Sequence, residues 1–180
     1  MLLNKDSTSS KLIIIRGVPG VGKSTISKKI ISMLKVSKKA YIPVDDFQLF
    51  DFRSPSNNKE KLAIKNAALL VRNFLIEGFD VVVDYAFDNA INYEKFITFI
   101  LKDTSENISE MNVYKFYIDA PIETIIRRNN SRENPMKVIL LKKLHDRIVA
   151  TKGAIYNEII VDSTKYSAKQ CAKNILDSIF

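Results

Sequence analysis

A glycine-rich run close to the start of the chain is the feature that most restricts its fold. Residues 17–24 read G-V-P-G-V-G-K-S, which matches the pattern G-x-x-x-x-G-K-[ST] at every fixed position. The aliphatic residues 12–15 precede this run and read as a strand that is buried on both faces. A helical pattern begins at Lys23. A strand, a glycine-rich loop and a helix in this order predict a loop that wraps a phosphate group.

The residue types in this loop suit the phosphates of a nucleotide. Glycine allows the backbone to turn its N–H groups inward, and the start of the helix adds partial positive charge. We expect the Lys23 ammonium to reach the β- and γ-phosphates of ATP, and the Ser24 hydroxyl to bind Mg²⁺. The predicted nucleotide-binding residues are Gly17, Val18, Pro19, Gly20, Val21, Gly22, Lys23, Ser24 and Thr25.

Short apolar runs alternate with longer helical patterns over the rest of the chain. Strands are predicted at residues 12–15, 41–44, 80–84, 113–118 and 159–161, and helices at 23–34, 59–76, 89–101, 135–151 and from 168 onward. A further helix begins near Pro121, and Asn134 with Pro135 is interpreted as the start of the helix after it. This alternation predicts an α/β protein with a three-layer P-loop NTPase fold: a five-stranded parallel sheet, helices on both faces and an arginine-bearing lid.

Composition limits the number of domains and the partners. No repeat or change in composition divides the chain, so we expect one domain, residues 1–180, with a polar tail at 1–10. The 28 Lys and Arg against 20 Asp and Glu give a net charge of +8, which suits a polyanion such as a nucleotide or a nucleic acid, although solvated lysines would give the same excess. A single cysteine, Cys171, excludes an internal disulfide and a cysteine-based zinc site, and a single histidine, His145, argues against a histidine-rich one.

No apolar run approaches the ~18 residues that a membrane span requires. The first residues are followed at once by polar ones, which is unlike a signal peptide. We therefore expect a cytoplasmic protein with no membrane partner. The sequence does not predict its oligomeric state.

Acidic residues follow the second and third predicted strands. Asp45 and Asp46 come directly after residues 41–44, so they should emerge at the carboxyl edge of the sheet beside the phosphate loop. A carboxylate there can accept the proton of an attacking hydroxyl, and Asp45 is the predicted general base. Asp84 ends the third strand, where an acid commonly holds Mg²⁺ directly or through water.

Arginines cluster after the fourth predicted strand. Guanidinium groups stabilise the charge that spreads over a transferred phosphoryl group. Arg128 and Arg132 are four residues apart, so both could face one nucleotide if the segment is helical or folds over the site as a lid. We predict both as catalytic, and Arg127 accompanies them. The alternative is a solvated basic helix end.

Two other nucleotide-binding folds fit less well. The glycines run G-x-x-G-x-G, which differs from the G-x-G-x-x-G of dinucleotide-binding folds and would leave Lys23 and Ser24 without a role. Residues 167–169 resemble the short guanine-side motif of GTPases, but no N-K-x-D run precedes them.

Taken together, these residues resemble the small P-loop kinases of the polynucleotide kinase and zeta-toxin type. Residues 17–25 look like their phosphate loop, and residues 44–47 (V-D-D-F) look like the segment whose first aspartate is the general base. Residues 117–132 are similar to the segment that leads into the arginine-bearing lid, and residues 160–164 are similar to the loop near the adenine. The chain departs from this pattern at Gln48, where polynucleotide kinases carry an arginine, and at Tyr85, where threonine is more usual.

The resemblance implies an ATP- and Mg²⁺-dependent kinase that transfers the γ-phosphoryl group to a hydroxyl acceptor. The acceptor could be the 5′-hydroxyl of a nucleic acid or a small molecule such as a nucleotide sugar, an antibiotic or a sugar acid. Net charge favours a nucleic acid, and Gln48 argues against one. The alternatives are a non-catalytic ATP-binding module and a nucleic-acid-binding protein, but the latter leaves the phosphate loop unexplained.

Overall fold

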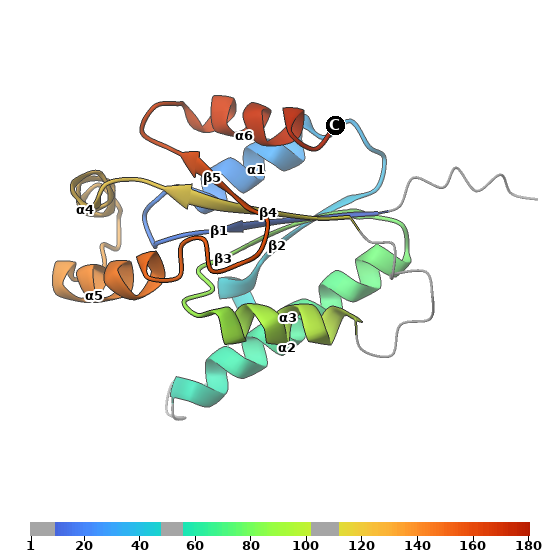
Figure 1. Cartoon of the computed structure of the whole chain (residues 1–180), viewed down its shortest axis with the longest axis horizontal. Coiled ribbons are helices and arrows are strands. Elements are labelled where there is room, and N and C mark those ends of the chain that lie inside the picture. The colour runs from blue at the N-terminus through green and yellow to red at the C-terminus, as the bar shows by residue number, and fades with distance from the viewer. Residues whose placement is uncertain (1–9, 48–55, 102–111) are drawn as a thin grey trace, which may run out of the picture.

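The computed structural model describes residues 10–47, 56–101 and 112–180. Its centre is a five-stranded parallel sheet in the order β2-β3-β1-β4-β5 (Figure 1). The strands are β1 (Lys11–Arg16), β2 (Lys39–Pro43), β3 (Asp80–Tyr85), β4 (Asn112–Asp119) and β5 (Glu158–Asp162). The predicted α/β fold is confirmed.

Helices cover both faces of this sheet. Figure 1 shows α1 and α6 on one face and α2 and α3 on the other, with α4 and α5 beyond one end of the strands. The helices are α1 (Lys23–Met33), α2 (Ser56–Ile76), α3 (Ala90–Leu101), α4 (Ile122–Asn130), α5 (Val138–Val149) and α6 (Ala168–Asp177), and a 3₁₀ turn, Val44–Phe47, follows β2. None of these helices in the described ranges is long and apolar enough to cross a membrane.

The side chains of the central strand β1 explain why helices cover both faces of the sheet. Successive side chains of a strand point to opposite faces. Ile13 and Ile15 accordingly pack into the core under α1 and α6, whereas Leu12 and Ile14 pack into the core above α2 and α3. All four side chains are buried, because each face needs its own apolar layer.

The strand order determines where a ligand can bind. β1 pairs with β3 on one side and with β4 on the other, so the chain leaves β1 at a point where the connections diverge. In parallel α/β sheets, ligands occupy the crevice beyond the carboxyl ends of such strands. The glycine-rich loop, Asp45 and Asp84 all come at this end of the sheet.

The start of α5 corrects one prediction. The helix begins at Val138 and not at Asn134 and Pro135. The Asn129 side chain, which is buried, donates to the Met136 carbonyl (2.8 Å) and accepts from the Met136 N–H (3.0 Å). These bonds keep Met136 out of α5, because its carbonyl would have to accept a helical hydrogen bond if the helix began earlier.

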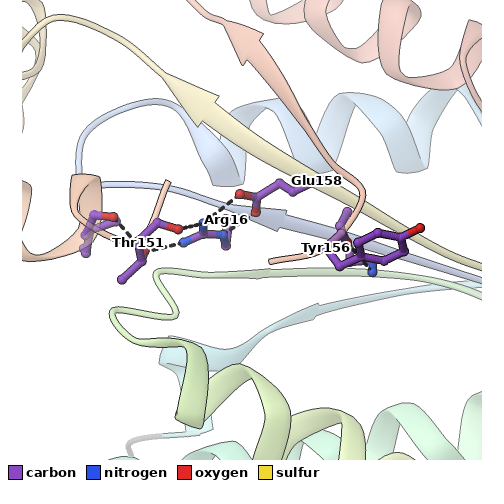
Figure 2. Close-up of polar contacts among 6 residues, drawn as sticks. Arg16, Thr151, Tyr156 and Glu158 are labelled. Carbon is purple, nitrogen blue, oxygen red and sulfur yellow. Dashed lines mark hydrogen bonds and ion pairs between the residues drawn. The ribbon is translucent and has the colours of Figure 1, made fainter. Parts of the chain in front are cut away.

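A buried ion pair joins the end of β1 to the start of β5 (Figure 2). The Arg16 side chain is 1% exposed, and its guanidinium donates to both carboxylate oxygens of Glu158. It also donates to the hydroxyl (2.8 Å) and carbonyl (2.7 Å) of Thr151, just beyond α5, and lies over the ring of Tyr117. Since Arg16 directly precedes Gly17, this contact ties the base of the glycine-rich loop to the segment that follows α5.

Candidate active site

The glycine-rich loop has the geometry of an anion-binding loop. Gly17 has φ +145°, and a Cβ there would lie 2.5 Å from the Ile118 carbonyl oxygen, so only glycine fits against β4. Gly22 has φ +109° and immediately precedes α1. No side chain caps α1, so its first backbone N–H groups are available to a bound anion.

Lys23 lies at the centre of this loop. It is 8% exposed, and its Nζ donates to the Val18 carbonyl across the loop (3.3 Å). Burial lowers the pKa of its ammonium, nearby Asp84 and Asp45 oppose that change, and Arg132 lowers the pKa further. Residues from four separate segments of the chain therefore meet around this ammonium.

Asp84 is buried beneath the loop and is linked to Ser24 through Tyr41. The Tyr41 hydroxyl donates to the Asp84 carboxylate at 2.5 Å. Burial raises the pKa of Tyr41 and the bond to Asp84 raises it further, whereas a hydrogen bond with Ser24 lowers it. Hydroxyl and carboxylate oxygens are the ligands that Mg²⁺ prefers, usually completed by phosphates and water. In the described residues, no group of three or more His, Cys, Asp or Glu forms a metal site by itself. The Ser24 hydroxyl and the Asp84 carboxylate are oxygen donors that would fit a Mg²⁺ whose other ligands are phosphates and water.

Asp45 lies at the start of the 3₁₀ turn after β2, on the surface of the same crevice. Surrounding protein atoms remove water from its carboxyl group and raise its pKa. Lys23 lowers that pKa, while Asp84 and Asp46 raise it. A carboxylate with a raised pKa beside a cationic loop is suited to accept a proton.

Two hollows flank the loop. One, of about 600 Å³, runs from Lys23 and Ser24 past Asp45 towards Glu60 and Arg147. The other, of about 370 Å³, lies between the loop and α6, and Arg128, Ser163 and Tyr166 line it. Gly20, Gly22 and Arg132 border both hollows. A phosphate chain bound by the loop would therefore lie between the two hollows.

The predicted arginines come together but differ in their contacts. The Arg128 guanidinium donates to the Val21 carbonyl (2.9 Å), and to the hydroxyl (3.0 Å) and carbonyl (2.8 Å) of Ser163. It thereby ties the glycine-rich loop to the segment after β5. Arg132 lies beyond the end of α4 and borders both hollows. Gln48, the predicted departure, lies outside the described residues.

The sequence did not point to several polar residues of the larger hollow. They come from α2, the loop before α3, and α5, and they are Glu60, Asp88 and Arg147. Asn92 of α3, which the sequence also did not indicate, donates to Glu60. Asp88 follows Asp84 just beyond a strand end, which was a usable signal. Glu60 and Arg147 read as ordinary charged helix positions, so no local pattern distinguished them.

The parallel sheet, the glycine-rich loop and the acids at its strand ends define a kinase-like P-loop nucleotide-binding fold. The chain is similar to the tunicamycin resistance protein of Deinococcus radiodurans, with a TM-score of 0.68 and 15% identity, over 94% of this chain and 95% of that one. It is also similar to the APS kinase CysC of Mycobacterium tuberculosis in complex with AMPPNP and APS, with a TM-score of 0.66 and 14% identity, over 95% and 98% of the two chains.

A third similar structure is the Pnkp1/Rnl/Hen1 RNA repair complex, with a TM-score of 0.64 and 20% identity. That match covers 84% of this chain but 48% of the other chain. Identities this low establish the fold alone. The resemblance to P-loop kinases is therefore confirmed, whereas the polynucleotide kinase type stays a prediction.

The family itself is identified by sequence. Residues 11–167 match the family described as chromatin associated protein KTI12. This match spans most of the chain. The protein belongs to the KTI12 family.

Proposed function

We propose that this chain is a Mg²⁺- and ATP-dependent phosphotransferase that acts as a single domain and moves the γ-phosphoryl group of ATP to a hydroxyl acceptor. The observation that carries the proposal is the position of Asp45. It lies close enough to Lys23 and Asp84 for their charges to act on its carboxyl group, and it borders the larger hollow. An acceptor in that hollow would have the base on one side and the γ-phosphate on the other.

The geometry supports the following roles. The backbone of residues 17–25 and the Lys23 ammonium hold the β- and γ-phosphates. Ser24 and Asp84 would hold Mg²⁺, Asp84 through water or directly, and the bound ion would supply positive charge to the phosphates. Asp45 takes the proton from the acceptor hydroxyl as its oxygen bonds to the γ-phosphorus, and the bond from that phosphorus to ADP breaks.

The two arginines have different proposed roles. Arg132 borders the loop from both sides, so its charge can follow the phosphoryl group during transfer. Arg128 keeps the loop against the wall of the smaller hollow, where the base and sugar of ATP would lie. We propose both for catalysis, with Arg128 acting indirectly by positioning the loop.

Two classes of acceptor are each favoured by an observation. The net charge of +8 and the family description as chromatin associated both suit a nucleic acid. The similar fold of an APS kinase, whose structure contains APS, suits a small molecule. The larger hollow, at about 600 Å³, has room for either a terminal nucleotide unit or a compact ligand.

A transfer assay with γ-labelled ATP tests the proposal. The acceptors are 5′-hydroxyl oligonucleotides, nucleosides, sugars, and aminoglycoside-like and chloramphenicol-like antibiotics. We expect label on one class with wild-type protein, and none with Lys23→Ala, which loses the charge on the β- and γ-phosphates. Equal transfer and equal ATP affinity in Lys23→Ala would contradict the proposal. Nucleotide binding with no transfer or hydrolysis under any condition would instead identify a non-catalytic ATP-binding module.

A further inference from the structure

The far end of the larger hollow is lined by several polar side chains that the transfer reaction itself does not require. Beyond Asp45, the wall consists of Glu60 from α2, Tyr85 from the end of β3, and Asp88 with Arg147 from two further segments. If the proposed function holds, the part of the acceptor next to its hydroxyl lies against this wall. The chemistry of the wall then limits which acceptors can bind.

The two carboxylates of this wall differ in their partners. Asp88 is paired with Arg147 at 2.5 Å, so its charge is compensated. Glu60 accepts hydrogen bonds from the Tyr85 hydroxyl (3.1 Å) and from the Asn92 amide (3.0 Å), and both of these donors are neutral. Asn92 also donates to Asp88 (3.3 Å), which joins the two carboxylates into one network.

Negative charge collects around the Tyr85 hydroxyl. Glu60 accepts the hydrogen bond of that hydroxyl, and Asp45 and Asp88 line the same hollow. Burial raises the pKa of Glu60 and Asp88 adds to the rise, whereas the hydrogen bond from Tyr85, the charge of Arg147 and the hydrogen bond from Asn92 oppose it. The phosphate end of the hollow carries Lys23 and Arg132, so the hollow is cationic at one end and anionic at the other.

An aromatic cluster holds this wall in place. Phe87 has φ +42°, a left-handed conformation that is costly for a bulky residue. Its buried ring packs against Tyr85, Tyr93 and Phe96 at centroid distances of 5.1, 5.6 and 5.3 Å. This turn brings Asp88 back beside Tyr85 at the hollow. The cluster therefore preorganises Tyr85 and Asp88 at the hollow.

We propose that Glu60 is the residue that selects the acceptor, and that the acceptor is an amino alcohol whose protonated amine binds Glu60 while its hydroxyl lies at Asp45. Among the described residues, Glu60 and Asp88 share one nearby cation, Arg147, so negative charge is in excess at this wall. A phosphate beside the hydroxyl would add to that excess, whereas an ammonium would balance it. In the transfer, only the acceptor O–H and the terminal phosphoryl bond of ATP break, and the amine is unchanged. This inference rests on the proposed function.

The test uses sugars that differ in one charged group. Glucosamine, glucose and glucose 6-phosphate are titrated into the protein loaded with Mg²⁺ and a non-hydrolysable ATP analogue, and binding is followed by the NMR shifts of Glu60 and Asn92 amides. We expect glucosamine to bind at least about tenfold more tightly than glucose 6-phosphate, as one charge-assisted hydrogen bond would give. Glu60→Gln, which can still accept from Tyr85 and Asn92, should abolish that preference. Glu94→Gln, on the exposed face of α3, is the matched control and should retain it.

The outcomes separate this inference from the proposed function. If the ATP analogue binds but glucosamine has no advantage, or if Glu60→Gln keeps the advantage, Glu60 does not select an amine and the proposed transferase function still stands. Failure of glucosamine to move the Glu60 and Asn92 signals has the same meaning. If the ATP analogue itself fails to bind to the wild-type protein, the proposed function is wrong, and the inference fails with it.

Discussion

At the scale of single residues, the candidate site depends on charges that are brought close together. Lys23, Asp45, Asp84 and Arg132 come from separate segments, yet each of the other three changes the pKa of Lys23. Such coupling between charged groups is typical of sites that handle phosphates and protons. Substitutions at these positions should therefore affect chemistry more than folding.

Replacement of Asp45 tests the general base. Asp45→Asn keeps the size of the side chain but cannot accept the proton, so transfer should fall about 10²–10⁴-fold while ATP affinity stays within a few-fold. The raised pKa of Asp45 means that the carboxyl group is protonated, and inactive, up to a higher pH than an ordinary aspartate. The acidic limb of the kcat/KM profile should therefore lie above the usual aspartate range and should disappear in Asp45→Asn.

Asp46→Asn is the matched control for that measurement. It changes the next carboxylate of the same turn, so it keeps the local fold and should cost much less activity. If Asp46→Asn were as damaging as Asp45→Asn, or if Asp45→Asn turned over normally, the base would be a different residue.

The two arginines should separate by their kinetic effects. Arg132→Ala should lower kcat about 10²–10³-fold with a smaller change in ATP affinity, because its charge acts mainly in the transition state. Arg128→Ala should instead weaken ATP binding and lower the free energy of unfolding by about 1.5–3 kcal/mol, because it removes bonds that hold Val21 and Ser163 together. Steady-state kinetics and urea unfolding measure both effects. Equal losses of affinity and kcat in Arg132→Ala would show that Arg132 binds the ground state.

At the scale of the elements, α5 depends on distant contacts. Its residues Leu144, Arg147 and Ile148 border the larger hollow. The Thr151 hydroxyl donates to the Ile148 carbonyl (2.7 Å) and also accepts from Arg16, so the end of α5 is joined to the end of β1. The ion pair of Figure 2 thus connects the strand before the phosphate loop with a wall of the hollow.

Glu158→Gln tests this connection. It removes the charge that compensates buried Arg16, and leaving one charge unpaired in the interior should lower the free energy of unfolding by about 3–5 kcal/mol. Thr151→Val loses the hydroxyl's bonds to the guanidinium and to the Ile148 carbonyl but keeps the charge pair, so it should cost less, about 1.5–3 kcal/mol. Urea unfolding at pH 7 gives both values. A Glu158→Gln protein that unfolds at the wild-type urea concentration would mean that Arg16 does not depend on this partner.

At the scale of the whole molecule, the glycine-rich loop lies where the sheet and several helices meet. The loop contacts β4 through Gly17, packs on α4 through Gly20 and continues into α1, so a bound nucleotide would touch segments from much of the sequence. A ligand that binds only the folded protein raises its stability by mass action. Nucleotide binding should therefore be visible in global unfolding.

Thermal unfolding with Mg²⁺ and ATP measures this effect. At one hundred times the dissociation constant, ATP should add about 2.7 kcal/mol to the free energy of unfolding and raise Tm by about 5–10 °C. Chelation of Mg²⁺ with EDTA should reduce the rise, and Lys23→Ala should lose most of it. An equal rise in Lys23→Ala would place the nucleotide away from this loop.

The sequence alone determined the features that depend on neighbouring residues. Five strands, the helices between them and the phosphate loop were all readable, because apolar periodicity and glycine spacing are local patterns. The strand ends at Asp45 and Asp84 were readable for the same reason, since parallel strands bring their carboxyl ends to one edge. The start of α5 was misread because its boundary depends on a side-chain contact from Asn129.

Only the tertiary structure decided which distant residues meet. Arg16 and Glu158 are 142 positions apart, and their pairing follows from the placement of β5 beside β4 rather than from any local pattern. The hydrogen bond between Asn92 of α3 and Glu60 likewise depends on how α2 packs beside α3. A charged residue looks the same in sequence whether it faces water or a binding site, because its surroundings come from other segments of the chain.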